Sequence, residues 1–405
     1  MKTKRYIKLG LNALILTYIA VAGVILAFGG FQFTFTVKSH TLIGPLLVIL
    51  AAVTVRVSLD IPPKKLAVAA VSVALTLVAL EGLIRWSYPK AALPVLRLYY
   101  RYAHEIGYEL IPGVAGTGSF GEAIVINSHG LRDVERPRAK PPGVTRILTL
   151  GDSFTFGMKV EAASSYPKAL EAMLNGEGDG RRYDVINAGV VAYSLCQERK
   201  WLGLKGWRYE PDLILIGFFG DDPHCQDEES GQRFLEPRVY RTFTRVSALY
   251  NFLRNSYSVF KARYLEWWRP AWTGGLEARS RFLERNNFTN IREEEWRAVA
   301  KDLRAIKAGA AERGAALLVV VIPDAGQVGF PEFQSPTRRL LAICKAEGIA
   351  CLDTTPLFEA AKKPLELYLY PLDPHLSPAG HSFVARAVAE RIADGGLLPA
   401  PSRRP

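Results

Sequence analysis

The sequence predicts an α/β fold in which helices cover both faces of a parallel sheet, preceded by membrane-spanning helices at the N-terminus. Two observations lead to this prediction. From residue 146 onward, short apolar runs alternate with stretches of helical spacing, the order typical of β-α-β units. The first 90 residues instead contain long apolar runs with few charges.

Composition and charge exclude several classes of protein. The 405-residue chain is 49% hydrophobic and 22% charged, which excludes a fully disordered, collagen-like or disulfide-scaffold protein. The net charge of +12, taken alone, suggests a nucleic-acid partner. However, residues 1–100 hold eleven basic and two acidic side chains, and the remaining residues hold 40 and 37. Because the excess lies among apolar runs, membrane topology explains it better, and we expect no nucleic-acid partner.

Three apolar runs predict a membrane anchor over residues 1–89. The first, 9–37, has 29 residues without a charged side chain, and about 20 suffice to cross a bilayer. A cleaved signal peptide is the alternative for this run. The other two, 41–55 and 66–80, have 15 residues each, so a buried helical hairpin is their alternative. The predicted transmembrane helices are 9–30, 39–58 and 66–86.

The basic residues near these runs predict their orientation. Lys and Arg cluster before the first run and between the second and third, whereas the loop between the first two holds only Lys38. Basic loops stay cytoplasmic. We therefore expect a multi-pass protein of the cell inner or plasma membrane, with a cytoplasmic N-terminus. Residues 90–398 would form an extracytoplasmic (periplasmic) domain, followed by a disordered tail, 399–405.

The elements of this domain follow from local patterns. Short apolar runs closed by Gly, Pro or polar residues predict buried strands at 146–150, 183–187, 212–219, 315–322 and 349–353. Helical spacing predicts helices at 166–174, 197–207, 293–313 and 336–347. A last helix opens with Ser377 as N-cap and Pro378 at its first position.

One segment, 223–292, interrupts this alternation and is predicted as an insertion. It is rich in Arg and aromatic residues, including Trp267, Trp268 and Trp272. It could be a lid over the site, a surface lying on the membrane, or an appendage that only packs.

Four cysteines form two local sets. Cys344 and Cys351 flank a helix-to-strand turn, whereas Cys196 and Cys225 follow the second and third strands and should lie at the same sheet end. Disulfides form outside the cytoplasm, so we predict the pairs Cys344–Cys351 and Cys196–Cys225. Four buried thiols are the alternative. None of the four has metal-ligand spacing, and no metal is expected.

Polar residues with catalytic potential follow the first strand and precede the last helix. Gly-Asp-Ser at 151–153 puts Ser153 on a tight turn that exposes its hydroxyl. Asp373-Pro-His375 provides an imidazole base and a carboxylate that can reach its other ring nitrogen through a local turn. Ligands bind at the carboxyl ends of parallel strands, so these residues should meet.

These motifs resemble those of the SGNH (GDSL-type) hydrolases over about residues 124–393. The resemblance implies a flavodoxin-like three-layer α/β/α sheet. It implies Ser153 as nucleophile, His375 as base and Asp373 as its partner. It also implies that Ser153 and Gly189, the latter in the Asn-Ala-Gly block 187–189, donate N–H groups to the oxyanion hole. The segment 126–132 resembles the lead-in of membrane-anchored members, and His381 is expected to be structural.

One block departs from this family. After the third strand the family has Gly-x-Asn-Asp, and here Asp221 stands in place of the oxyanion-hole Asn. An ionised carboxylate only accepts hydrogen bonds and would repel an oxyanion. Either Asp221 is protonated, or another group donates, such as the Gly220 N–H or His224, or catalysis is weak.

The resemblance implies three possible functions. The first is an extracytoplasmic ester hydrolase acting on O-acylated glycans or lipids. The second is an O-acyltransferase that uses the same triad to modify an exopolysaccharide or envelope glycan, together with a membrane acyltransferase or polysaccharide-assembly partner. The third is an inactive or weakly active glycan-binding or assembly protein. No cofactor is implied.

Overall fold

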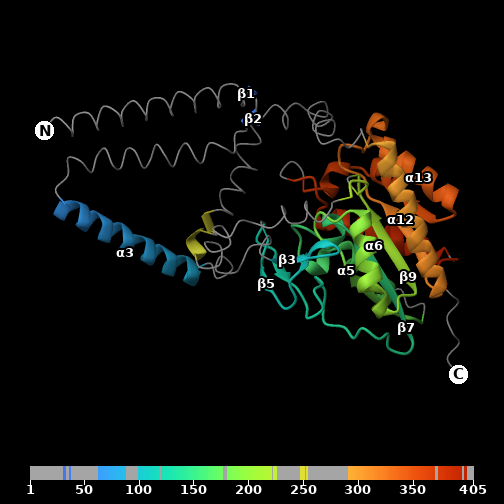
Figure 1. Ribbon diagram of the computed structural model, residues 1–405, viewed down its shortest axis with the longest axis horizontal. Coiled ribbons are helices and arrows are strands. Elements are labelled where there is room, and N and C mark those ends of the chain that lie inside the picture. Colours follow the sequence, from blue (N-terminus) through green and yellow to red (C-terminus); the bar gives the residue numbers. More distant parts are fainter. Residues whose placement is uncertain are drawn as a thin grey trace. The chain divides into compact units, whose positions relative to one another are not determined.

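The computed structural model of the chain describes residues 31–32, 36–37, 63–87, 99–118, 120–176, 180–220, 222–225, 247–250, 252–253, 291–369, 373–394 and 396–398 (Figure 1). The chain divides into two compact units, residues 1–82 and residues 83–405. Most of the predicted insertion 223–292 and the predicted tail 399–405 lie outside the described residues.

The described elements of the N-terminal part are one short hairpin and one helix. Strands β1 (Phe31–Gln32) and β2 (Thr36–Val37) pair antiparallel, and α3 spans Pro63–Ser87. Within the described residues, no helix combines the length and the apolarity needed to cross a membrane.

This finding contradicts the predicted localisation as a multi-pass membrane protein. The third predicted span, 66–86, falls within α3, which carries Lys64 and Lys65 in its first turn and Glu81 and Arg85 near its end. Between these charges the uncharged run has 15 residues, fewer than the about 20 that a bilayer requires. The other two predicted spans, 9–30 and 39–58, lie outside the described residues.

A five-stranded parallel sheet forms the centre of the second unit, as the sequence predicted. Its strands lie in the order β11-β10-β9-β7-β8, so the first strand along the chain is flanked by the second and the third. The strands are β7 (Val144–Gly151), β8 (Arg182–Asn187), β9 (Leu213–Phe218), β10 (Ala316–Val321) and β11 (Ala350–Asp353).

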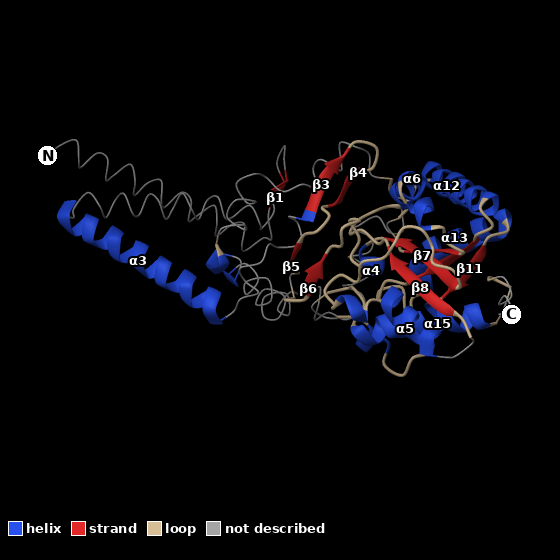
Figure 2. Ribbon diagram, turned by 90° about the horizontal axis from the view of Figure 1, so that it is seen from below, coloured by secondary structure: helices blue, strands red, loops and turns tan. Residues whose placement is uncertain are grey.

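Helices cover both faces of this sheet, which confirms the predicted α/β layering. Figure 2 shows α6 (Leu195–Leu204), α12 (Glu293–Glu312) and α13 (Ser335–Glu347) on one side, and α5 (Tyr166–Gly176) and α15 (Pro378–Ala393) on the other. The shorter helices are α4 (Ser153–Phe156), α14 (Thr355–Ala360) and the 3-10 turns Ala162–Ser164, Gly206–Tyr209, Pro331–Gln334 and Pro364–Leu367.

The strands are mostly apolar because both faces of the sheet are covered. Successive residues of a strand point to opposite faces. On β9, Ile214 and Ile216 pack in the cluster beneath α6 and α12, whereas Leu213 and Leu215 pack in the cluster beneath α5 and α15. Because both faces are covered, every position of β9 is buried.

Two small hairpins precede the sheet. Strands β3 (Tyr100–Ala103) and β4 (Gly107–Leu110) pair antiparallel, as do β5 (Ala115–Thr117) and β6 (Ala123–Val125). Tyr108 fastens the first hairpin to the loop that follows β8. Its hydroxyl donates to Val191 O at 2.8 Å, and its carbonyl accepts from the Tyr193 hydroxyl at 2.6 Å. This hairpin is therefore attached to the sheet end where ligand sites are expected.

Candidate active site

The turn after β7 holds Ser153 at the start of α4. Asp152 is the N-cap, and its Oδ1 accepts the Phe154 N–H at 2.9 Å. At Gly151, φ is +151°, and a Cβ there would lie 2.0 Å from Thr155 Oγ1 and 2.9 Å from Gly217 O. Any side chain at position 151 would clash, so local packing requires a glycine at the tight turn that Gly-Asp-Ser predicted.

The structure brings Ser153, His375 and Asp373 together as a continuous chain of hydrogen bonds. His375 Nε2 lies 2.8 Å from Ser153 Oγ, and His375 Nδ1 lies 2.5 Å from Asp373 Oδ1. All three side chains are largely shielded, with Ser153 and Asp373 each 8% exposed. With Nδ1 donating to the carboxylate, Nε2 is left as the acceptor for the serine proton.

The His375 ring has a fixed orientation. The Asp373 carboxylate accepts the His375 backbone N–H at 3.0 Å, which is the local turn expected around Pro374. The Leu369 N–H donates to His375 O at 2.8 Å. One side of the ring packs on Phe154, with 5.0 Å between centroids, and Phe154 in turn stacks on Phe219 at 4.2 Å. The imidazole is thus held by both polar and apolar contacts.

Of the residues predicted for the oxyanion hole, Ser153 offers a backbone N–H at a helix start, whereas the Gly189 N–H already donates to another group. Ser153 is the first residue of α4, so its N–H is one that the helix leaves unpaired. The Gly189 N–H, however, donates to Asn187 Oδ1 at 3.0 Å, and Asn187 Nδ2 donates to Thr155 O at 2.9 Å. Gly189 therefore lies against α4, with its N–H bound to the Asn187 side chain. Asp221 lies outside the described residues.

His224, the alternative oxyanion donor, pairs with another element. Its Nδ1 lies 2.8 Å from Glu295 Oε1 on α12. This hydrogen bond, together with contacts to Arg292, lowers the pKa of Glu295 to about 2 against the opposing effect of its partial burial. His224 is thus tied to α12 through Nδ1, and this pairing does not direct it to Ser153.

Arg132 is a supporting residue that sequence reasoning missed. It is 1% exposed and donates to four backbone carbonyls, those of Ala123, Phe156, Gly157 and Val160. Burial lowers its pKa to about 10, so it keeps its charge at neutral pH. The segment 126–132 resembles the lead-in of a known family, but nothing in that resemblance predicts that Arg132 binds the carbonyls of the loop after α4.

A second missed residue is Lys159, in that same loop. Its ammonium forms an ion pair with Asp373 Oδ2, the carboxylate oxygen that does not contact His375. No spacing rule connects Lys159 with Asp373, which are 214 residues apart.

Behind the nucleophile turn lie buried groups that stay neutral. His381 accepts the Tyr166 N–H at 3.2 Å through Nδ1, and burial lowers its pKa to about 3. It is therefore an uncharged structural residue, as expected. Burial and the nearby charge of Asp152 raise the pKa of Glu198 well above its usual range. Within the part of the chain that the structure describes, neither Glu198 oxygen has a hydrogen-bond partner.

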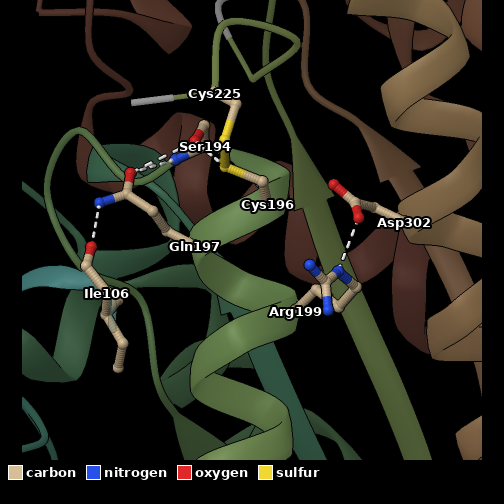
Figure 3. The surroundings of a disulfide bond; sticks show 7 residues. All are labelled: Ile106, Ser194, Cys196, Gln197, Arg199, Cys225 and Asp302. Carbon is tan, nitrogen blue, oxygen red and sulfur yellow. Dashed lines mark hydrogen bonds and ion pairs between the residues drawn. A yellow bond between two sulfur atoms is a disulfide. The ribbon is translucent and has the colours of Figure 1, made fainter. Parts of the chain in front are cut away.

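One of the two predicted disulfides is formed. Cys196, at the start of α6, is bonded to Cys225 in the loop after β9, with 5.7 Å between Cα atoms (Figure 3). Beside it, Gln197 Nε2 donates to Ile106 O at 2.8 Å, and Arg199 pairs with Asp302 of α12. The disulfide therefore joins the segment after β8 to the segment after β9, the two strands that flank β7.

The other predicted disulfide, Cys344–Cys351, is absent, because both residues are free cysteines. The thiols are nevertheless neighbours. A hydrogen bond between them lowers the pKa of Cys344 and raises that of Cys351. The sequence thus predicted their proximity correctly and their bonding wrongly. In the described ranges, no cluster of His, Cys, Asp and Glu could hold a metal ion.

Comparison with known proteins locates one family match. Residues 280–404 match the family model of the SGNH hydrolase-like domain of the acetyltransferase AlgX. A search of curated proteins finds no match to this chain.

Several solved structures are distantly similar. The lipase/acylhydrolase from Enterococcus faecalis is 12% identical, with a TM-score of 0.39 over 64% of this chain and 100% of its own. The acetylxylan esterase Axe2 from Geobacillus stearothermophilus is 14% identical, with a TM-score of 0.37 over 63% of this chain and 97% of its own. The family model supports the resemblance to SGNH hydrolases over residues 280–404, which include Asp373 and His375 but not Ser153.

Proposed function

We propose that this protein is a serine-dependent acyl-ester enzyme in which Ser153 takes an acyl group from an oxygen ester. The observation that supports this proposal is the chain Ser153–His375–Asp373, with distances of 2.8 Å and 2.5 Å between the bonded atoms. A serine, an imidazole and a carboxylate in this order perform nucleophilic acyl transfer.

The proposed reaction has two halves. His375 Nε2 takes the proton of Ser153 as Oγ attacks the ester carbonyl, and the imidazolium is stabilised by Asp373. Collapse of the tetrahedral intermediate expels the alcohol, which receives that proton, and leaves an acyl-serine. An acceptor hydroxyl, of water or of a sugar, then loses its proton to His375 and attacks the acyl-serine, which regenerates Ser153.

The developing oxyanion needs donors. The N–H of Ser153 is the first proposed donor, and Gly189 would be the second by sharing its N–H between the oxyanion and Asn187 Oδ1. Asp221 would donate only in its protonated form. If it is ionised, replacing it by Asn should raise turnover about tenfold or more, since one such donor contributes about 10²–10³.

Two acceptors, and hence two functions, fit this site. Water gives an ester hydrolase acting on O-acylated glycans or lipids, the simplest outcome of the triad. A sugar hydroxyl gives an O-acetyltransferase acting on a glycan. The family match over residues 280–404 favours this second candidate, because that family model is named for an acetyltransferase.

The first test is turnover of p-nitrophenyl acetate by the full-length chain, beside Ser153→Ala and the control Ser87→Ala. Ser87 is an exposed serine of α3 whose hydroxyl donates to Leu83 O. We expect p-nitrophenol release by the wild type and Ser87→Ala, and a loss of at least 10³-fold in Ser153→Ala. Fluorophosphonate labelling followed by peptide mass spectrometry should place the adduct on Ser153. No turnover and no label in the folded wild type would overturn the proposal and favour a binding protein.

The second test separates the two acceptors. p-Nitrophenyl acetate is supplied with an excess of a neutral oligosaccharide, and free acetate and acetylated sugar are both quantified by mass spectrometry. Acetate equal to p-nitrophenol identifies a hydrolase. Acetylated sugar that forms with the wild type and not with Ser153→Ala identifies a transferase.

A further inference from the structure

The two oxygens of the Asp373 carboxylate have different partners. Oδ1 accepts both the backbone N–H of His375 at 3.0 Å and His375 Nδ1 at 2.5 Å. Oδ2 is bound by the ammonium of Lys159. The side chains of Lys159 and Asp373 are only 12% and 11% exposed, so this ion pair is shielded from water, where charge interactions are stronger than at the surface.

The backbone at Lys159 is held in a conformation that its residue type disfavours. Its φ is +70°, in the left-handed region that side chains with a Cβ rarely adopt. Arg132 fixes the backbone around Lys159 by binding the carbonyl of Gly157, two residues before, and that of Val160, the next residue. Strained backbone of this kind persists where the surrounding structure enforces it, and it is concentrated at functional sites.

The Lys159 ammonium also lies over an aromatic ring. Its ammonium lies 5.2 Å from the centroid of the Phe120 ring, and the Glu161 carboxylate binds the backbone N–H of Ala123 nearby. Phe120 and Ala123 belong to the hairpin segment before the sheet, so this segment and the loop after α4 together direct the ammonium to Asp373.

Resting on the proposed function, we propose that Lys159 is a positioning residue of the triad, which holds the Asp373 carboxylate so that Oδ1 faces His375 and offsets part of its negative charge. The lysine binds the carboxylate oxygen that does not contact His375. It acts through Asp373: the His375 backbone N–H and ring hold Oδ1, and the lysine adds a second constraint by holding Oδ2.

The charge effect has a definite sign at His375. Among the described residues, the groups that face the ring or act on it include Asp373, Ser153 with its neighbour Asp152, Lys159 behind Asp373, and the neutral His381 of α15. A carboxylate beside an imidazole favours the imidazolium. A cation on the far oxygen weakens that effect, so removal of Lys159 should raise the pKa of the His375 imidazole.

The test uses the full-length chain and four proteins: wild type, Lys159→Met, Lys159→Arg and the control Lys140→Met. Lys140 also pairs with an aspartate, Asp212, with side-chain exposures of 25% and 24%, at the amino end of β7 and β9 away from Ser153. Two quantities are measured. One is kcat/KM for p-nitrophenyl acetate against pH, and the other is the His375 pKa by NMR titration of nitrogen-labelled histidines.

In Lys159→Met we expect kcat/KM to fall about tenfold at neutral pH and the His375 pKa to rise by ~0.5–1 unit. Lys159→Arg should restore both, and Lys140→Met should change neither. An unchanged His375 pKa in Lys159→Met, or the same changes in Lys140→Met, would overturn the inference. Because NMR reads the imidazole without substrate, a chain that shows the pKa shift but no turnover would support the positioning role while disproving the proposed function.

Discussion

Ser153 and His375 share one hydrogen bond, yet they are held in place by different means. The Ser153 turn is fixed by buried contacts: Gly151 packs on Gly217, Asn187 binds Thr155 O, and Arg132 binds the carbonyls of Gly157 and Val160 after α4. The segment that carries His375 is instead held by the Asp373 turn, the ion pair with Lys159 and the N-cap of α15 at Ser377.

Because of this difference, we expect some variants to change the free energy of unfolding and others to change turnover. Contacts of the Ser153 turn are buried, so their loss should lower the free energy of unfolding. Contacts of the His375 segment include an ion pair and hydrogen bonds that orient the imidazole, so their loss should change turnover more than stability.

Arg132→Met should have the largest effect on stability. Four carbonyls lose their donor in a buried site, and we expect a loss of about 4 kcal/mol, because buried unsatisfied groups cost ~1–3 kcal/mol each and are not additive. Turnover of the fraction that remains folded should fall at least tenfold, since the loop of Lys159 loses its anchor. Urea unfolding and p-nitrophenyl acetate turnover measure the two effects.

Arg146→Met is the matched control. Arg146 is 0% exposed and binds Arg138 O, Tyr209 O and Asp184, but it lies near the start of β7, at the sheet end opposite Ser153. It should lose similar stability with full turnover of the folded fraction. Equal turnover in the two folded variants would contradict the idea that Arg132 supports the site.

The disulfide should contribute the next largest effect. A crosslink between residues 29 apart stabilises by about 3 kcal/mol through the unfolded chain, so replacing Cys196 and Cys225 together by Ser should lower the melting temperature strongly. Replacing the free Cys344 and Cys351 should cost less. Thermal unfolding with and without dithiothreitol distinguishes them: the reductant should destabilise the wild type and leave the Cys196/Cys225 variant unchanged. A wild type insensitive to reductant would show that this crosslink does not stabilise the fold.

Gly189→Ala probes how closely the loop after β8 approaches α4. An added Cβ would lie 2.4 Å from Phe156 N and 2.7 Å from the carbonyl carbon of Thr155, which are backbone atoms that cannot rotate away. We expect a loss of about 2 kcal/mol by urea unfolding. Gly203→Ala in α6, where nothing lies within 4 Å, should instead gain about 0.5–1 kcal/mol. Similar stability of the two variants would mean that the loop yields more easily than this packing indicates.

These contrasts also show what could be predicted from the sequence. The strands were predictable because a strand buried on both faces is apolar at every position, as in β9, and because Gly151 and Pro211 mark their ends. Ser153, His375 and Asp373 were predictable because each lies at a loop that a parallel sheet brings to one end. The prediction of a multi-pass membrane protein is contradicted by the described residues, in which no helix is long and apolar enough to cross a membrane.

The supporting residues could not be predicted in the same way. Lys159 binds Asp373, and Arg132 binds the Val160 carbonyl, which is 28 residues away in the chain. Such contacts depend on tertiary structure and leave no periodic pattern in the sequence. The Gly189 N–H, predicted to face the oxyanion, is bound by Asn187, two residues before it. Local patterns thus indicate which residues carry chemistry, whereas the contacts that orient them emerge only from packing.

Ser377→Ala is the smallest expected effect and tests the His375 side of the contrast. Ser377 caps α15 by accepting the Gly380 N–H at 3.2 Å, and its hydroxyl donates to Glu366 O at 2.8 Å. Loss of an N-cap costs about 1 kcal/mol. Because Ser377 lies two residues after His375, its loss should also lower kcat a few-fold and leave KM unchanged. Ser194→Ala removes the capping box of α6 and should cost similar stability with unchanged kcat. If both variants kept full kcat, the cap of α15 would contribute to folding alone, and Lys159 with the Asp373 turn would suffice to orient the imidazole.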